Sequence, residues 1–260
     1  MQPGDHVCVT GASGYIASDL IANLLSRGLF VHGTVRSTSP GKCSHLLELP
    51  GARERLQLFE ADLKGPSAGF VEAIKGCSIV FHTACPFVYN ARAACLGEDF
   101  FVGPAVQGTE TVLAACREAG GIKRVVMTSS CAAIFKKNVP EGHVYSEVDW
   151  NDPEELATRK MWYSIGKTKQ EQAAWAWMEN EKPEFSLVCI NPVRKLWPYP
   201  SQPPIFHHKT YPHKPAPNHH AAFFLLSSAW WRVQPDSPTS MPARKTCLIC
   251  AVEPSPSFPT

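Results

Sequence analysis

Tyr163 and Lys167 stand four residues apart in the stretch YSIGK, directly before a strongly helical segment. Residues at i and i+4 share a helix face, so a phenol and an ammonium group at this spacing can converge on one neighbour. A free tyrosine titrates near ~10, and a cation that stabilises its phenolate makes it a better general acid and base. Two polar side chains on a solvated helix face would show the same spacing. The pair alone leaves both interpretations open.

A glycine-rich turn lies close to the N-terminus. The segment VTGASGYIASDL carries Gly11, Gly14 and Ala17 between a β-branched run and a helical stretch. Gly11 permits a tight turn, Gly14 lets the backbone approach a pyrophosphate, and Ala17 lets the helix pack close to the sheet. The anion would lie at the helix N-terminus. The cofactor-binding residues predicted at this turn are Gly11, Ser13, Gly14, Tyr15 and Ile16.

The end of the second predicted strand indicates which dinucleotide binds. An acid there would hydrogen-bond a ribose 2′-hydroxyl, whereas an arginine accommodates a 2′-phosphate. The stretch GTVRST ends in Arg36 with no acid beside it, and Lys42 follows a few residues later. Lys42 fits a second positive contact, although a solvated loop lysine would look the same. The sequence favours NADP(H) over NAD(H).

Polar and small residues follow the next three predicted strands. A carboxylate after the third strand would accept from the adenine amino group while the neighbouring leucine packs on the ring. In open α/β folds ligands bind at the carboxyl edge of the sheet, although each residue also suits ordinary loop capping. The residues are Asp62 and Leu63 after the third strand, Thr83, Ala84 and Cys85 after the fourth, and Ser129 and Ser130 after the fifth.

Six short apolar runs alternate with helical stretches up to about residue 193. Strands this apolar are expected to be covered by helices on both faces, and the alternation is typical of parallel sheets with crossover helices. The fold class predicted is α/β, a Rossmann-type doubly wound parallel sheet. The strands are HVCVTG, FVHGTVR, LQLFEADL, SIVFHTA, RVVMTSS and FSLVCINP. The helices include SDLIANLLSRG, GFVEAIKGC, GPAVQGTETVLAACREAG and the segment that carries Tyr163.

The amino-acid composition of the chain changes after Val193. Residues 194–260 hold more than half of the prolines and only two acids, Asp236 and Glu253. Dense proline removes backbone donors, so we expect little regular structure there except a short helix near AAFFLLSSAWW. The sequence predicts two regions, 1–193 as an NADP-binding domain with the Tyr/Lys pair and 194–260 as a divergent tail.

Composition excludes several classes of function. The 260 residues are 44% hydrophobic with a formal net charge of +2 and no dense basic run, so neither nucleic acid nor an anionic membrane is an expected partner. No export pattern or apolar run long enough to cross a bilayer is present, which predicts a cytoplasmic protein. The ten cysteines are scattered through apolar segments and are expected to be reduced. No metal site is predicted, because Cys247 and Cys250 lack a second pair and the tail histidine pairs lack a rigid frame.

The ordered motifs resemble the extended short-chain dehydrogenase/reductase family over about residues 5 to 193. They look most like the dihydroflavonol and cinnamoyl-CoA reductase branch of the NAD-dependent epimerase/dehydratase superfamily. The segments on which this resemblance rests are VCVTGASGYIAS, TVRS, FEADL, AIKGCSIVFHTA, PAVQGTETVL, RVVMTSS, YSIGKTKQEQAAW and INPV. The resemblance implies an NADPH-dependent oxidoreductase that acts on a small-molecule ketone, aldehyde or alcohol.

The same resemblance implies residue roles. Tyr163 would exchange the proton, Lys167 would stabilise the phenolate and hydrogen-bond the nicotinamide ribose, and Ser130 would polarise the carbonyl, with Ser129 as the alternative. Pro192 and Val193 would border the nicotinamide. A nucleotide-sugar epimerase or a hydroxysteroid dehydrogenase remains possible, but Arg36 argues against the epimerase, which usually retains NAD.

The sequence departs from the family after INPV. A smaller substrate domain normally follows, and residues 194–260 do not resemble it. We hypothesise an altered reading frame, a retained intron or a truncated gene model; an uninterrupted transcript together with tail peptides would disprove this. The alternative function is therefore a catalytically weak or inactive NADP-binding protein without its substrate domain.

Overall fold

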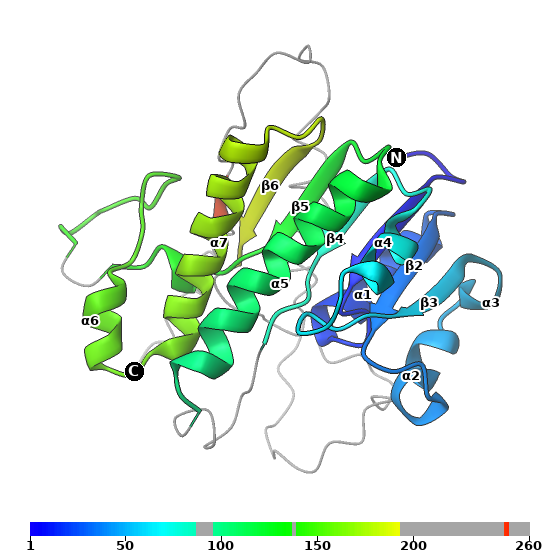
Figure 1. The fold of residues 1–260 in the computed structure, drawn as a ribbon, viewed down its shortest axis with the longest axis horizontal. Helices are drawn as coiled ribbons and strands as arrows, with labels where there is room; N and C mark the ends of the chain where they lie inside the picture. Colours follow the sequence, from blue (N-terminus) through cyan, green and yellow to red (C-terminus); the bar gives the residue numbers. More distant parts are fainter. Residues whose placement is uncertain (87–95, 137–138, 193–246, 250–260) are drawn as a thin grey trace, which may run out of the picture.

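A single parallel sheet organises the protein. The computed structural model describes residues 1–86, 96–136, 139–192 and 247–249, and Figure 1 shows helices packed along the sheet. The strands are β1 (His6–Thr10), β2 (Phe30–Val35), β3 (Leu56–Glu60), β4 (Ile79–His82), β5 (Arg124–Thr128), β6 (Ser186–Asn191) and β7 (Cys247–Ile249). Their spatial order is β3-β2-β1-β4-β5-β6-β7, and every neighbouring pair is parallel. This order confirms the predicted Rossmann-type sheet.

Helices of very different length connect the strands. The long ones lie where the sequence predicted helices, whereas α2, α3 and α6 arise in segments for which no helix was predicted. The helices are α1 (Tyr15–Ser26), α2 (Pro40–Leu47), α3 (Ala52–Arg55), α4 (Ala68–Ile74), α5 (Glu98–Ala119), α6 (Pro153–Thr158) and α7 (Trp162–Glu181), with a 3₁₀ turn, η2 (Cys131–Ala133).

Two apolar clusters fill the space on either side of the sheet. On one face, α4, α5 and α7 contribute residues such as Phe70, Leu113 and Met178. In Figure 1, α5 and α7 cross β4, β5 and β6 on this side. On the other face, α1 and α2 contribute residues such as Ile21 and Leu46. Strand residues alternate between the two clusters, as a sheet covered on both faces requires.

The sheet has its switch point between β1 and β4. The chain runs outward from β1 to β2 and β3, then returns to β4 on the other side. In open sheets of this order, ligands bind outside the carboxyl ends of the strands at that reversal. The strand-end residues predicted from sequence therefore share one edge.

Beyond residue 192 the structure describes only β7. Its three residues pair in parallel with Cys189, Ile190 and Asn191 of β6. They lie in the segment for which the sequence predicted little regular structure, and a partner strand extends the sheet there. The short helix expected near residues 221–231 lies outside the described residues.

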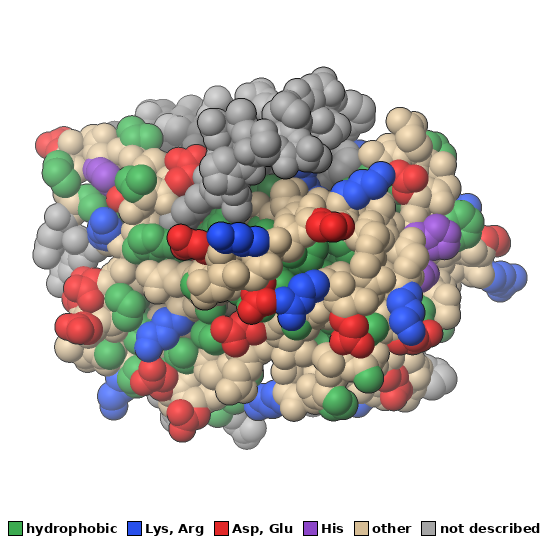
Figure 2. Space-filling model, turned by 45° about the horizontal axis from the view of Figure 1, so that its top comes forward, with side chains coloured by type: hydrophobic (Ala, Val, Ile, Leu, Met, Phe, Trp, Pro, Cys, Tyr) green, Lys and Arg blue, Asp and Glu red, His purple; other side chains and the backbone are tan. Residues whose placement is uncertain are grey.

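Charges of both signs are mixed on the surface. Figure 2 shows acidic and basic side chains interspersed over one face, in keeping with the formal net charge of +2. Among the described residues, no helix combines the length and apolarity that a membrane span would need.

Candidate active site

The turn between β1 and α1 depends on Gly11. Its φ is +67°, a conformation that side-chain-bearing residues rarely adopt, and an added Cβ would lie 3.0 Å from Ala84 Cα. The Gly11 N–H donates to Thr34 Oγ1 at 3.2 Å, so β2 holds the turn. Gly14 is the N-cap of α1 and has no side-chain cap, which leaves a helix N-terminus suited to an anion.

We expect the substitution Gly11→Ala to destabilise the protein and to weaken dinucleotide binding. Gly76→Ala is the matched control, because Gly76 also has a positive φ of +76° but an added Cβ would meet nothing within 4 Å. The positive φ costs each variant roughly 1–2 kcal/mol. Chemical denaturation should show an additional loss of about 1 kcal/mol for Gly11→Ala. Equal losses in the two variants would show that the Ala84 contact is unimportant.

The ends of β1 and β4 are tied together. Thr83 Oγ1 donates to Thr10 O, while the N–H groups of Thr83 and Ala84 donate to Thr10 Oγ1 at 3.2 and 3.1 Å. These bonds place Ala84 against Gly11. Cys85 follows, half-buried, and its Sγ donates to Gln170 Oε1 of α7 at 3.7 Å. The structure thus brings the three residues predicted after β4 to the switch point.

The predicted phosphate-binding cations are exposed. Arg36 follows β2 directly and Lys42 lies on α2, and both side chains reach solvent. An acid that sequence reasoning missed lies near Arg36: Glu60, at the end of β3, accepts from Thr38 N and Thr38 Oγ1, both at 2.8 Å. These two bonds lower the pKa of Glu60. They connect it to the loop after Arg36.

The two residues predicted to contact adenine have local roles. Asp62 Oδ1 accepts from Lys64 N at 3.0 Å, which is the loop capping considered as the alternative. Leu63 is half-buried and packs so tightly on Gly108 of α5 that an added Cβ there would lie 2.8 Å from it. Asp62 itself is exposed and Leu63 is not fully covered, so both remain predictions for the adenine site.

Lys167 is buried, with 3% of its surface exposed. Its Nζ donates to Thr128 O at 2.9 Å and to Gln170 Oε1 at 3.1 Å. Burial would lower the pKa of Lys167, but Cys85, Tyr163 and Glu171 more than offset this and raise it above its usual value. The side chain is therefore a buried cation, and the solvated-face interpretation is wrong for this residue.

Tyr163 lies one turn before Lys167 on α7 and is only partly exposed. Burial raises the pKa of its phenol above the ordinary value, while Lys167 and a hydrogen bond with Ser130 act in the opposite direction. The phenol is protonated at neutral pH, the state that a proton donor needs.

The two serines after β5 differ in accessibility. Ser129 is buried, and its Oγ donates to Glu171 Oε2 at 2.5 Å. Ser130 is half-buried, caps η2 by accepting from Ala132 N at 3.1 Å, and interacts with Tyr163. Only Ser130 combines access with proximity to the phenol. The catalytic role of Ser130 remains a prediction.

Glu171 connects α7 to Ser129 after β5 and to Asn191 at the end of β6. This residue was not predicted from the sequence. The residue is completely buried, and its carboxyl group also accepts from Asn191 Nδ2 at 2.9 Å and from Trp175 Nε1 at 3.4 Å. Asn191 Nδ2 donates to Ser130 O as well. Its position four residues after Lys167, on the same helix face, was the available signal.

The remaining predicted residue near the nicotinamide is Pro192. It is half-buried, and its carbonyl oxygen accepts from Cys131 N at 3.1 Å, which ties the end of β6 to η2. Val193 lies outside the described residues. So do the tail histidine pairs and Cys250, while within the described residues no three His, Cys, Asp or Glu side chains gather as metal ligands. Seven cysteines are free thiols: Cys8, Cys43, Cys77, Cys85, Cys116, Cys131 and Cys189.

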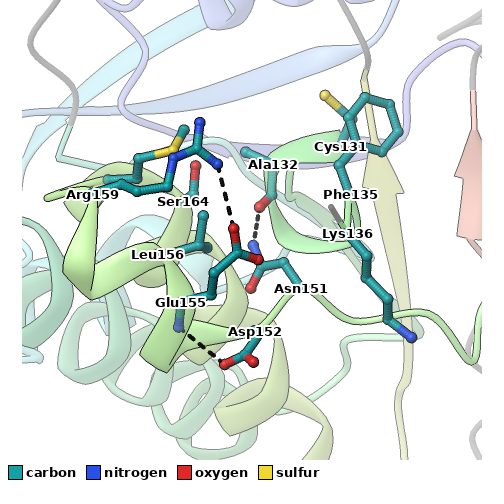
Figure 3. Close-up of a pocket in the computed structure, with 11 residues that line it drawn as sticks. Cys131, Ala132, Phe135, Lys136, Asn151, Asp152, Glu155, Leu156, Arg159 and Ser164 are labelled. Atoms are coloured by element: carbon teal, nitrogen blue, oxygen red, sulfur yellow. Dashed lines mark hydrogen bonds and ion pairs between the residues drawn. The ribbon is translucent and has the colours of Figure 1, made fainter. Parts of the chain in front are cut away.

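A pocket of about 400 Å³ lies between η2, α6 and the start of α7 (Figure 3). Two of its lining residues, Cys131 and Ser164, are chain neighbours of Ser130 and Tyr163. Two charged groups at the wall, Arg159 and Glu155, form an ion pair at 3.6 Å. The other lining residues are Ala132, Phe135, Lys136, Asn151, Asp152, Leu156 and Met161.

Known proteins share this sequence and fold. The family model described as "NAD dependent epimerase/dehydratase family" matches residues 7–213, beyond residue 193 where the sequence resemblance ends. The chain is 41% identical over 198 residues to cinnamoyl-CoA reductase CAD2 of Medicago truncatula, covering 75% of this chain and 59% of that protein. It is 40% identical over 210 residues to dihydroflavonol 4-reductase of Arabidopsis thaliana, covering 77% and 52%.

Solved structures agree with the sequence relatives. Vestitone reductase from alfalfa (Medicago sativa) has a TM-score of 0.58 at 33% identity, covering 71% of this chain and 57% of that one. Yeast methylglyoxal/isovaleraldehyde reductase Gre2, complexed with NADPH, has a TM-score of 0.61 at 28% identity, covering 72% and 57%. The chain spans less than two thirds of the length of these relatives. By its motifs, its strand order and these matches, the chain belongs to the NAD-dependent epimerase/dehydratase family.

Proposed function

We propose that the chain binds NADP(H) and reduces a small-molecule ketone or aldehyde, as a relative of cinnamoyl-CoA and dihydroflavonol reductases. The observation that carries this proposal is the buried Lys167 ammonium, one helical turn from a protonated Tyr163 beside Ser130. A buried cation is costly unless it is paired and hydrogen-bonded, and perturbed groups of this kind cluster at catalytic sites.

The residues present fit a dinucleotide. At Gly11 a side chain would collide with Ala84, and the uncapped start of α1 at Gly14 offers backbone donors for a pyrophosphate. Arg36 would hold the 2′-phosphate at the end of β2. NADPH supplies a hydride from its nicotinamide C4.

The chain's own side chains supply the rest of the chemistry. The Ser130 hydroxyl would donate to the carbonyl oxygen and polarise it. Tyr163 would then protonate that oxygen, and the Lys167 ammonium would stabilise the phenolate left behind. Alcohol oxidation would reverse these steps.

The pocket supports an apolar or aromatic substrate. Phe135, Leu156 and Met161 line it beside the neighbours of Ser130 and Tyr163. An aromatic aldehyde would bury apolar surface there, which favours binding by about 25 cal/mol per Å². Aromatic aldehydes should therefore be reduced with a lower KM than short aliphatic ones.

A catalytically weak NADP-binding protein is the second candidate. It is favoured by the sequence after residue 193, which does not resemble the substrate domain of the family. Measuring NADPH binding by fluorescence, alongside turnover of a panel of aldehydes and ketones, separates the two. Turnover supports the reductase; binding without turnover supports the second candidate; neither would reject both.

We expect Arg36→Ala to weaken NADPH binding by about 10–100-fold while leaving NADH binding almost unchanged, because a charge-assisted hydrogen bond contributes ~1.5–3 kcal/mol. Arg27→Ala is the control, since Arg27 is also exposed but lies after α1, at the opposite end of that helix from the glycine turn. Fluorescence titration with both nucleotides is the measurement. Equal effects on NADPH and NADH would contradict the assignment.

A further inference from the structure

A buried chain of side-chain hydrogen bonds runs from β1 to Lys167. His82 Nδ1 lies 2.9 Å from Thr10 Oγ1, and His82 Nε2 lies 3.1 Å from Thr109 Oγ1 on α5. Gln170 Nε2 donates to Thr109 Oγ1 at 2.8 Å, and Gln170 Oε1 accepts from Lys167 Nζ. Each of these five side chains is at most 3% exposed.

The donor and the acceptor can be assigned for each hydrogen bond between Thr10, His82 and Thr109. Thr10 Oγ1 already accepts from two backbone N–H groups, so its own O–H is available to donate to His82 Nδ1. Burial, with repulsion from the nearby lysine, lowers the pKa of His82 to about 3. The ring is neutral, and its single N–H lies on Nε2 and donates to Thr109.

The Lys167 ammonium, which can only donate, determines how the Gln170 amide is oriented. The amide N–H donates to Thr109 Oγ1, which leaves the Gln170 carbonyl oxygen facing Lys167. The reversed orientation would place an N–H₂ group against an ammonium, with two donors and no acceptor. The amide oxygen and Thr128 O together hold Nζ at its place beside the phenol.

We propose that Gln170 is a positioning residue for Lys167, anchored through its amide N–H to Thr109 so that its carbonyl oxygen holds the ammonium. The bond holds the ammonium where it stabilises the Tyr163 phenolate. This role rests on the proposed function, because it matters for catalysis only if Tyr163 exchanges a proton.

The test compares Gln170→Met, which keeps length and removes the amide, with Gln170→Glu, which keeps an oxygen toward Lys167. Gln172→Met is the control, because Gln172 is exposed on the same helix. Gln170→Met should lower kcat about tenfold with little change in the KM for NADPH, and Gln170→Glu should recover most of the activity. Unchanged kcat in Gln170→Met would overturn the proposal.

An NMR titration of ring-labelled tyrosine gives a readout that needs no turnover. The titratable groups near the phenol are Lys167 on α7, Cys85 after β4 and Cys131 in η2. A displaced ammonium stabilises the phenolate less, so the pKa of Tyr163 should rise by about one pH unit in Gln170→Met but not in Gln172→Met. An unchanged pKa would overturn the positioning role even if activity fell. A raised pKa in a protein that reduces no carbonyl would support positioning and reject the reductase.

Discussion

Replacing Tyr163 by phenylalanine is expected to lower the kcat of carbonyl reduction by about 10²–10⁴-fold, the usual contribution of a general acid. NADPH should still bind, because the turn at Gly11 and Arg36 are untouched. Steady-state kinetics and fluorescence titration on the same preparation measure both quantities. Tyr145→Phe is the control: the Tyr145 hydroxyl donates to Lys136 O and has no place in the proposed chemistry.

The pH profile of the native protein adds a second test of Tyr163. Reduction needs the protonated phenol, and burial raises the pKa of this group, so activity should persist through neutral pH and fall as pH rises through that pKa. The basic fall should vanish in the residual activity of Tyr163→Phe. Unchanged turnover in the variant, or loss of NADPH binding along with turnover, would contradict the assigned role.

Replacing Glu171 by alanine is expected to cost about 3 kcal/mol or more of unfolding free energy. Two buried donors, Ser129 Oγ and Asn191 Nδ2, and the half-buried Trp175 Nε1 lose the acceptor that Glu171 provides, and each buried donor left unsatisfied costs roughly 1–3 kcal/mol. Chemical denaturation measures the loss. Glu179→Ala should change stability by only about 0.5 kcal/mol, because Glu179 is exposed on the same helix.

The substitution Glu171→Ala should also disturb the candidate active site. Asn191 also donates to Ser130 O, so a displaced Asn191 releases the backbone that places the proposed carbonyl-binding hydroxyl. A variant with wild-type stability would show that the three donors find other acceptors, which contradicts the role given to this carboxyl group.

Strands β1 to β6 could be predicted because each is a short apolar run flanked by turn residues. Parallel strands covered on both faces leave this signal, as VCV in β1 and VVM in β5 show. The helix α2 could not be predicted, because PGKCSHLL is only eight residues long and begins with Pro-Gly, and its Cys43 and Leu46 are buried in the apolar cluster that they share with α1. β7 depends on a partner strand far away in sequence.

The motif residues of the site were predictable, whereas the groups that hold them were not. Gly11, Ser130, Tyr163 and Lys167 occur at spacings that indicate their chemistry. Glu171 shares a helix face with Lys167, but on a helix of low apolarity that spacing also fits a solvated charge. Its burial comes from packing of α7 against α5 and the strand ends, where Gly166 brings the two helices so close that an added Cβ would lie 3.1 Å from Phe101 O. No local pattern encodes such a contact.

The most direct test is deuteride transfer. The purified chain would be incubated with NADPH deuterated at nicotinamide C4 and an aromatic aldehyde, and the alcohol formed would be examined by mass spectrometry. The account predicts deuterium at the former carbonyl carbon with the native chain and about 10²–10⁴-fold less labelled product per unit time with Tyr163→Phe. NADPH binding without any labelled alcohol, or labelling at the same rate with Tyr163→Phe, would contradict it.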